Sequence, residues 1–273
     1  MSHRIEVYTN CYAQYGLDAV LDHLPLPQCS AVEMGLKAHL VKEAMVTEED
    51  TLTEASSDEA VAAAQERLQQ AGIAVTAANG GDTLSDPDGV RHVRRRMDIA
   101  RRLGAGTFVA SFGWQGDEPS GVYPRIRELG EYARERGMVL ALETHAPLVK
   151  NAEAGLRTLD EVQCDNVGVN WDTANIYYMN EGVDGAAELR RVAHHVRHVH
   201  LKDSRKKAGQ WFFPALGEGD IDFAEIAGIL DEAGFNGTMS IEIEGIEGET
   251  PGLAVRRKRI EDSLAHLEKV GVL

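Results

Sequence analysis

Short apolar runs rich in β-branched residues recur along the chain, and helical patterns separate most of them. Each run has the length of a typical strand. The runs predict eight strands: Arg4–Thr9, Ala31–Met34, Ile73–Ala78, Thr107–Phe112, Val139–Thr144, Val167–Asp172, Val196–Leu201 and Thr238–Glu244.

The segments between these runs carry helix start and stop signals. The segment 58–71 opens with two acidic residues and is followed by Gly72, and both features are typical of helix ends. The same reasoning predicts further helices, each followed closely by a glycine: Asp86-Pro87 to about Leu103, Tyr123–Arg136 and Asp222–Ala233. Strands that alternate with helices of this length indicate parallel βαβ units.

Eight such units in a chain of 273 residues predict an α/β protein with a (β/α)8 TIM barrel. Because the strand signals cover nearly the whole chain, we expect a single domain over residues 1–273. A doubly wound open sheet is the alternative. Such a sheet normally has a glycine-rich phosphate loop after its first strand, whereas this junction reads Thr9-Asn10-Cys11-Tyr12.

Four of the later strands alternate between apolar and polar residues. Since side chains alternate across a strand, the apolar set should pack on the helices and the polar set should point into the barrel. The inward sets are Ala141, Glu143 and His145; Gly168, Asn170 and Asp172; His198, His200 and Lys202; and Ser240, Glu242 and Glu244. The polar residues of these sets concentrate toward the carboxyl ends of the strands, where barrel active sites lie.

Each of these four strands therefore offers one metal-type ligand at similar depth. The predicted set is Glu143, Asp172, His200 and Glu242. Three carboxylates and one imidazole suit a divalent Mn, Mg, Co or Zn ion. Carboxylates crowded at one barrel mouth repel each other, and one divalent cation removes that cost.

Composition narrows the possible partners. The formal net charge of −16 argues against binding to nucleic acid or to an anionic membrane surface. No run approaches the roughly 18 apolar residues of a membrane span, and the first residues do not resemble a secretory signal. Three cysteines without CxxC spacing do not suggest a disulfide framework. We therefore expect a cytoplasmic protein that acts on a small molecule.

Four short motifs in this sequence resemble those of a known protein family. ALETH (141–145), NWDTAN (170–175), HVHLKD (198–203) and SIEIEG (240–245) resemble the signature strands of the xylose isomerase-like TIM-barrel superfamily, in its sugar phosphate isomerase/epimerase branch. The resemblance extends from the first strand to the last. It implies the same four metal ligands, with His200 preferred over His198 and Glu242 over Glu244.

The resemblance also implies a mechanism. Ketose epimerases of this family use their two metal-bound glutamates as an acid/base pair, which here are Glu143 and Glu242. One removes the proton next to a carbonyl, the other returns a proton on the opposite face, and the metal polarises the carbonyl and stabilises the enediolate.

Several further residues are candidates for substrate binding. His145 and Lys202 share the parity of the metal ligands, and Trp114 follows the fourth strand, where it could face a sugar. Asn175 stands where many sugar epimerases have a histidine. Arg205 belongs to the basic run Ser204–Lys207, which could hold a phosphate or an acidic sugar.

Other residues have expected structural roles, or roles that the sequence leaves open. Asp203 faces away from the inward set and should fix its loop or pair with a neighbour. Glu33 points inward on the second strand, toward either substrate or a buried partner. The acidic segment Lys37–Ser57 should cover the barrel mouth or mediate dimerisation. The aromatic run Trp211–Phe213 should form a lid or a contact in a homodimer or homotetramer.

The leading hypothesis is a divalent-metal-dependent isomerase or epimerase of a sugar or sugar derivative. One alternative is a metal-dependent dehydratase of inosose or dehydroshikimate type, which shares the proton abstraction but expels a hydroxyl group. Another is a non-catalytic sugar-binding barrel. The endonuclease IV branch of the superfamily is disfavoured, because the segment 209–214 lacks the Asp-x-His pair of its zinc site.

Overall fold

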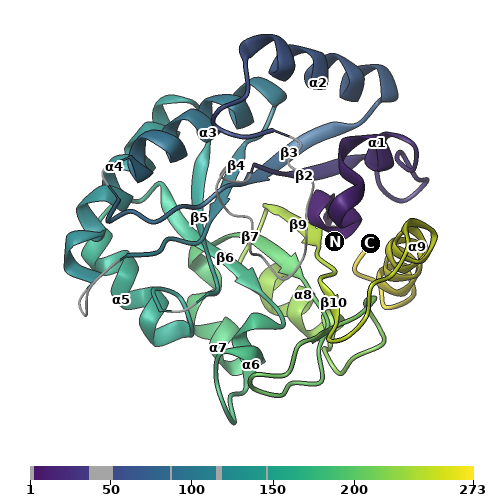
Figure 1. The fold of residues 1–273 in the computed structure, drawn as a ribbon. Coiled ribbons are helices and arrows are strands. Elements are labelled where there is room, and N and C mark those ends of the chain that lie inside the picture. Colours follow the sequence, from purple (N-terminus) through teal and green to yellow (C-terminus); the bar gives the residue numbers. More distant parts are fainter. Residues whose placement is uncertain (1–2, 37–51, 87, 115–118, 146) are drawn as a thin grey trace.

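The chain forms a closed barrel of eight parallel strands with helices on its outside, as Figure 1 shows along the barrel. The computed structural model describes residues 3–36, 52–86, 88–114, 119–145 and 147–273. Each strand pairs with the next, and the ring closes between the last strand and the first. The barrel strands are β1 Arg4–Tyr8, β2 Ala31–Gly35, β3 Ala74–Asn79, β4 Thr107–Ala110, β5 Val139–Glu143, β6 Val167–Asp172, β7 Val196–Leu201 and β9 Thr238–Ile241. The predicted (β/α)8 barrel is thus confirmed.

The described α-helices follow the strands around the barrel. They are α1 Gly16–Leu21, α2 Asp58–Ala71, α3 Gly89–Leu103, α4 Tyr123–Glu135, α5 Ala152–Val162, α6 Asn175–Tyr178, α7 Gly185–Val192, α8 Phe223–Glu232 and α9 Leu253–Lys269. Three 3-10 helices, η1 Thr9–Tyr15, η2 Pro119–Gly121 and η3 Ala193–His195, complete the connections.

The predicted helix ends agree closely with the structure, because local side chains determine them. Helix α2 begins after Ser57, whose side chain accepts a hydrogen bond from the Ala60 amide, and ends at Gly72. Gly72 has a φ of 72°, a left-handed conformation that glycine adopts without strain. Helix α8 begins after Asp222, which accepts from the Glu225 amide in the same way. Pro87, at the predicted start of the second helix, lies outside the described residues.

Two predicted strands end at least two residues earlier than expected. The fourth ends at Ala110 rather than Phe112, and the last ends at Ile241 rather than Glu244. After β9 the chain leaves the barrel and forms β10, Gly245–Ile246, which pairs antiparallel with β8, Phe212–Phe213. This small second sheet draws the chain away from the barrel, so Glu242 and Glu244 lie just beyond the strand end.

Alternation along the strands separates core from site, as predicted. Val169, Trp171, Val199 and Leu201 belong to the hydrophobic core, whereas the residues between them on β6 and β7 form polar interactions inside the barrel. Glu6, Asn170, His198 and Ser240 are fully buried there and bond to one another. Buried polar groups are stable only when they are paired, and this layer forms the floor beneath the barrel mouth.

A buried arginine ties together the loops that follow β2 and β3. Arg96 on α3 is fully buried and lies 2.9 Å from Glu54 and 3.0 Å from Asp82. It also donates to the carbonyl oxygens of Gly80 and Gly81. One planar guanidinium thus fixes two mouth loops. The expectation for Lys37–Ser57 concerns mostly residues 37–51, which lie outside the described part of the chain.

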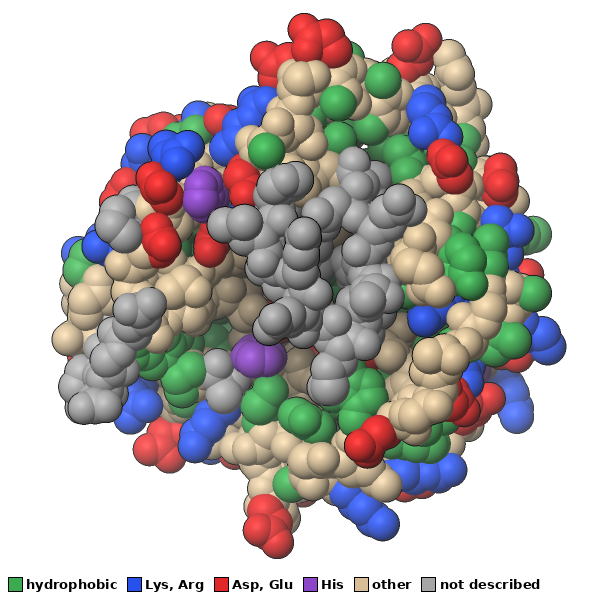
Figure 2. Space-filling model, in the orientation of Figure 1, with side chains coloured by type: hydrophobic (Ala, Val, Ile, Leu, Met, Phe, Trp, Pro, Cys, Tyr) green, Lys and Arg blue, Asp and Glu red, His purple; other side chains and the backbone are tan. Residues whose placement is uncertain are grey.

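The described surface carries both signs of charge. On the face drawn in Figure 2, acidic and basic side chains are interspersed around the periphery. Among the helices that the structure describes, none has the length and apolar character needed to cross a membrane.

Candidate active site

The four predicted metal ligands converge at the barrel mouth. Glu143 ends β5, Asp172 ends β6, His200 lies near the end of β7, and Glu242 follows β9. One potential ligand atom from each lies within 4.8 Å of the other three. Parallel strands place their carboxyl ends at one rim, so four residues that are far apart in sequence become neighbours.

Three atoms of this cluster have unused bonding capacity. Asp172 Oδ2, His200 Nδ1 and Glu242 Oε2 are buried and have no hydrogen-bond partner among the described residues. The other Asp172 oxygen accepts from the amides of Ala174 and Asn175, both at 2.8 Å. Buried polar atoms are normally satisfied. A cation held by these atoms would satisfy them, so the residues present fit a divalent metal.

Lys202 is the cationic side chain that faces this acidic cluster. It is buried, and its Nζ lies 3.3 Å from Glu242 Oε2, 3.6 Å from Asp172 Oδ2 and 2.5 Å from Glu244 Oε2. Burial alone would lower the pKa of Lys202, but the surrounding carboxylates outweigh it and raise that pKa well above its usual value. Lys202 therefore stays charged, and its predicted inward orientation is confirmed.

The pKa values of the neighbouring acids diverge. Burial raises the pKa of Asp172 to about 7, although Lys202 opposes the shift. Burial also raises the pKa of Glu242, but Lys202 and His200 outweigh it and leave that pKa well below its usual range. Glu242 is thus a carboxylate at neutral pH, and carboxylates whose environments separate their pKa values are typical of acid/base sites.

His200 presents its two ring nitrogens to different groups. Nδ1 faces Glu242 at 3.2 Å and Glu143 at 3.6 Å, and Nε2 lies 3.0 Å from Glu33 Oε2. Burial lowers the pKa of His200, but the carboxylates of Glu33 and Glu242 raise it well above its usual value. Glu33, which the sequence left between two roles, therefore contacts a buried partner.

His198 occupies a different environment from His200, although both have the same parity. Its Nδ1 lies 2.9 Å from Asn170 Oδ1 and its Nε2 lies 2.8 Å from Glu6 Oε1. Glu33, His198 and His200 also form a group close enough to hold an ion. Since both nitrogens of His198 are already engaged by other residues, we assign this deeper group to the barrel floor.

Two residues of the site were missed by the sequence reasoning. Asn10, in η1, donates from Nδ2 to Glu242 Oε1 at 2.8 Å. The signal was present, since Asn10 follows the first strand and therefore lies at the rim. Glu244, set aside in favour of Glu242, contacts Lys202; its inward parity was the available signal.

The predicted substrate-binding residues divide into two groups. Asn175 is buried beside the cluster, and its Oδ1 lies 3.4 Å from Lys202 Nζ. Trp114 is half-buried after β4, and His145 is exposed just beyond β5. Arg205 is exposed, pairs with Asp220 at 3.2 Å and lies over the Phe212 ring. The structure therefore brings Asn175 and Lys202 to the candidate metal ligands and ties Arg205 to the neighbouring loop.

The loop after β7 is anchored by Asp203, as predicted. This buried carboxylate accepts hydrogen bonds from the amides of Ser204, Gly217, Gly219 and Ile221. The same loop carries β8, where the Phe213 ring lies 4.4 Å from Lys202 Nζ. Phe213 also contacts the rings of Tyr178 and Trp211. The expected aromatic run thus forms one wall beside the site.

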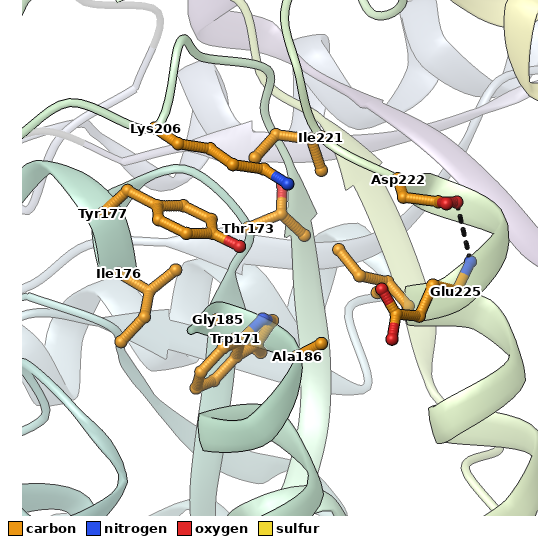
Figure 3. A pocket seen from close by; sticks show the side chains of 11 residues that line it. Trp171, Thr173, Ile176, Tyr177, Gly185, Ala186, Lys206, Ile221, Asp222 and Glu225 are labelled. Carbon is orange, nitrogen blue, oxygen red and sulfur yellow. Dashed lines mark hydrogen bonds between the residues drawn. The ribbon is translucent and has the colours of Figure 1, made fainter. Parts of the chain in front are cut away.

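A small pocket lies elsewhere, between β6 and the helices α7 and α8. Figure 3 shows Trp171 at its base, with Lys206 and the Tyr177 hydroxyl directed into it. Asp222 and Glu225, which also line it, are joined by the hydrogen bond that caps α8. Trp171 has the outward parity of core residues, so this pocket lies on the helix side of the barrel wall.

The fold agrees with a comparison to known families. The family model described as xylose isomerase-like TIM barrel matches residues 30–270. The chain belongs to this family.

Individual relatives match only part of the chain, at low sequence identity. The chain is 30% identical over 135 residues to an inosose dehydratase of Clostridium perfringens, covering 44% of this chain and 45% of that protein. The chain thus matches about half the length of this curated relative.

Solved structures share the fold over nearly the whole chain. A structure of L-ribulose 3-epimerase matches with a TM-score of 0.71 and 20% identity, covering 99% of this chain and 96% of the other. A xylose isomerase-like TIM barrel protein from Mycobacterium smegmatis, in complex with magnesium, matches with a TM-score of 0.74 and 17% identity, over 99% and 98% of the two chains. At these identities the likeness concerns the fold.

Proposed function

We propose that this chain is a divalent-metal-dependent enzyme that removes a proton next to the carbonyl of a sugar or sugar-derived ketone, with isomerisation or epimerisation as the overall reaction. The observation that carries the proposal is the cluster of Glu143, Asp172, His200 and Glu242, three of whose buried ligand atoms have no hydrogen-bond partner among the described residues. Five acids, including Glu33 and Glu244, surround Lys202 and His200, so a dication would also balance charge.

The chain's own groups supply the acid and the base. Glu242 is held by Asn10 and is ionised at neutral pH, which suits it to accept a proton. Glu143, whose Oε1 lies 3.6 Å from His200 Nδ1, is the second carboxyl group and returns a proton to the substrate. When bound, the metal would act as a Lewis acid on the substrate carbonyl.

Three other side chains serve the substrate. Lys202 and Asn175 lie together and can hold a substrate oxygen by a charge-assisted hydrogen bond. Phe213 covers Lys202 and presents an apolar ring toward a sugar's C–H groups. Trp114 and His145 remain candidates for the outer part of the site.

Dehydration is the second candidate reaction. It begins with the same proton abstraction but ends with the loss of a hydroxyl group as water. The similarity to an inosose dehydratase over part of the chain favours it.

Exchange of the substrate's carbon-bound hydrogen with deuterated water tests the shared step. A panel of ketoses, inososes and dehydroshikimate is followed by NMR, which also separates epimerised from dehydrated products. For any substrate that the wild type turns over, Glu143→Gln and Glu242→Gln should each slow exchange by about 10²- to 10⁴-fold.

The matched control is Glu218→Gln, which changes an exposed acid and should leave exchange unaltered. Full exchange by both site variants would refute the assigned pair. Sugar binding by wild type without exchange on any substrate would favour the non-catalytic barrel.

A further inference from the structure

Glu33 reaches across the barrel to a candidate metal ligand. It lies on β2, whereas His200 lies on β7, and β1 and β9 separate these two strands on that side of the ring. Both Glu33 oxygens lie close to His200 Nε2, at 3.0 and 3.2 Å. Glu33 itself is fully buried.

The His200 ring is restrained on other sides as well. The Tyr8 ring stacks on it with centroids 5.5 Å apart and planes at 23°. The His198 ring meets it edge-on at the same centroid distance. The ring therefore has a defined orientation before any ligand arrives, with Nε2 toward the floor and Nδ1 toward Glu242 and Glu143.

A carboxylate beside Nε2 decides which nitrogen can bind a cation. A carboxylate accepts hydrogen bonds only, so Nε2 must carry the proton in this contact. In the neutral imidazole the lone pair is then on Nδ1, which points into the cluster. A metal-bound histidine whose other nitrogen donates to a carboxylate has its tautomer and orientation fixed in this way.

We propose that Glu33 is a positioning residue that holds His200 with its Nδ1 lone pair facing the candidate metal site. The proposal rests on the proposed function, because it assumes that a divalent cation binds among Glu143, Asp172, His200 and Glu242. Glu33 touches neither the cation nor the substrate and acts through His200.

Four variants separate the effect of the length of the Glu33 side chain from the effect of its charge and from the effect of altering any buried acid. Glu33→Ala removes the acceptor. Glu33→Asp keeps the charge but shortens the side chain by one methylene, and Glu33→Gln keeps the length and a carbonyl acceptor without the charge. Glu6→Gln is the matched control: Glu6 is an equally buried acid on the adjacent strand, but it contacts His198.

Mn²⁺ affinity, measured by calorimetry, should fall by about 10- to 100-fold in Glu33→Ala and Glu33→Asp. Glu33→Gln and Glu6→Gln should stay within about threefold of wild type. Circular dichroism identifies the variants that remain folded. A structural role alone would not produce the predicted difference between Glu33→Asp and Glu33→Gln.

Nitrogen-15 NMR of the zinc-loaded protein gives a second, direct readout. His200 should be metallated at Nδ1 and protonated at Nε2 in wild type. Metallation at Nε2, or wild-type Mn²⁺ affinity in folded Glu33→Ala, would overturn the positioning role while leaving the metal site intact. If wild type binds neither Mn²⁺ nor Zn²⁺, both this inference and the proposed metal-dependent function fail.

Discussion

Lys202 Nζ lies 2.5 Å from Glu244 Oε2, in a buried position where each charge depends on the other. Glu244 follows the last barrel strand, β9, and Lys202 follows β7; these two strands are paired neighbours, so the residues beyond their ends lie close together. Burial raises the pKa of Glu244, even though Lys202 acts against that shift. Lys202, together with His200, thus supplies the positive charge that faces this group of acids when no metal is bound.

Replacing Lys202 should therefore affect the metal-free protein most. Lys202→Met keeps the length but removes the ammonium group that faces Asp172, Glu242 and Glu244, and we expect a loss of about 3–5 kcal/mol in unfolding free energy. Urea denaturation with and without Mn²⁺ measures it, and the metal should restore part of the loss. Lys258→Met, which breaks an exposed pair with Asp262, should leave the stability close to that of wild type. Equal stability of the two variants would contradict the dependence described here.

Chelation should lower the thermal stability of the protein. A cation that binds only the folded state stabilises it by about 2.7 kcal/mol at a hundredfold excess over its dissociation constant. Mn²⁺ or Zn²⁺ should therefore raise Tm after treatment with EDTA, and Asp172→Asn should largely remove that rise. Asp220→Asn changes an exposed acid that pairs with Arg205 and should respond like wild type. A Tm that is insensitive to both metals would argue against the site.

Arg96 should be among the most sensitive positions outside the candidate site. Arg96→Met removes the buried guanidinium that donates to Glu54, Asp82 and the carbonyl oxygens of Gly80 and Gly81, so about 3–5 kcal/mol of unfolding free energy should be lost. Arg94→Met, on the same helix, breaks the more exposed pair with Glu128 and should cost about 1 kcal/mol or less. Guanidinium titrations compare the two variants. Similar losses of unfolding free energy would refute the role of Arg96 in fixing the two loops.

Replacing Gly81 or Gly228 with alanine should change the stability of the fold in opposite directions. A Cβ on Gly81 would lie 1.9 Å from the Ser111 carbonyl oxygen, so Gly81→Ala should destabilise the fold by at least about 2 kcal/mol. Gly228 lies on the exposed face of α8 with open space around its Cβ position. Gly228→Ala should stabilise by about 0.5–1 kcal/mol through helix propensity. Thermal unfolding of both variants tests the contrast, and a stabilising Gly81→Ala would contradict it.

The cysteines should be unreactive in the folded protein. All three are buried, and burial raises the pKa of Cys29 to about 11 and also raises that of Cys164. The thiolate is the nucleophile, and at pH 8 only about one protein molecule in a thousand would carry Cys29 as a thiolate. Alkylation of Cys29 should accelerate as pH rises toward 11, and all three thiols should react in guanidinium. Rapid modification of folded protein at pH 8, detected by mass spectrometry, would contradict this expectation.

Local pattern was sufficient for the strands, the helix ends and the four converging residues. Period-two alternation decided which residues of β5, β6 and β7 point inward, and strand direction decided at which rim they gather. Caps such as Ser57 and Asp222 act within three residues, so their effect is readable from adjacent sequence. The end of β9 was predicted too late, because the chain beyond it pairs through Gly245–Ile246 with Phe212–Phe213, a contact between distant segments that local pattern does not show.

The sequence by itself thus determined the barrel and the inward set of candidate ligands, because both follow from short-range periodicity. It left His198 and His200 equivalent by pattern, and only tertiary structure separates them. Ring closure brings Glu33, 167 positions away, to His200, and brings Glu6 to His198. The distances between strands decide which ring nitrogen of His200 faces the barrel mouth and which acids lie next to Lys202. Alternation along a single strand carries no information about those distances.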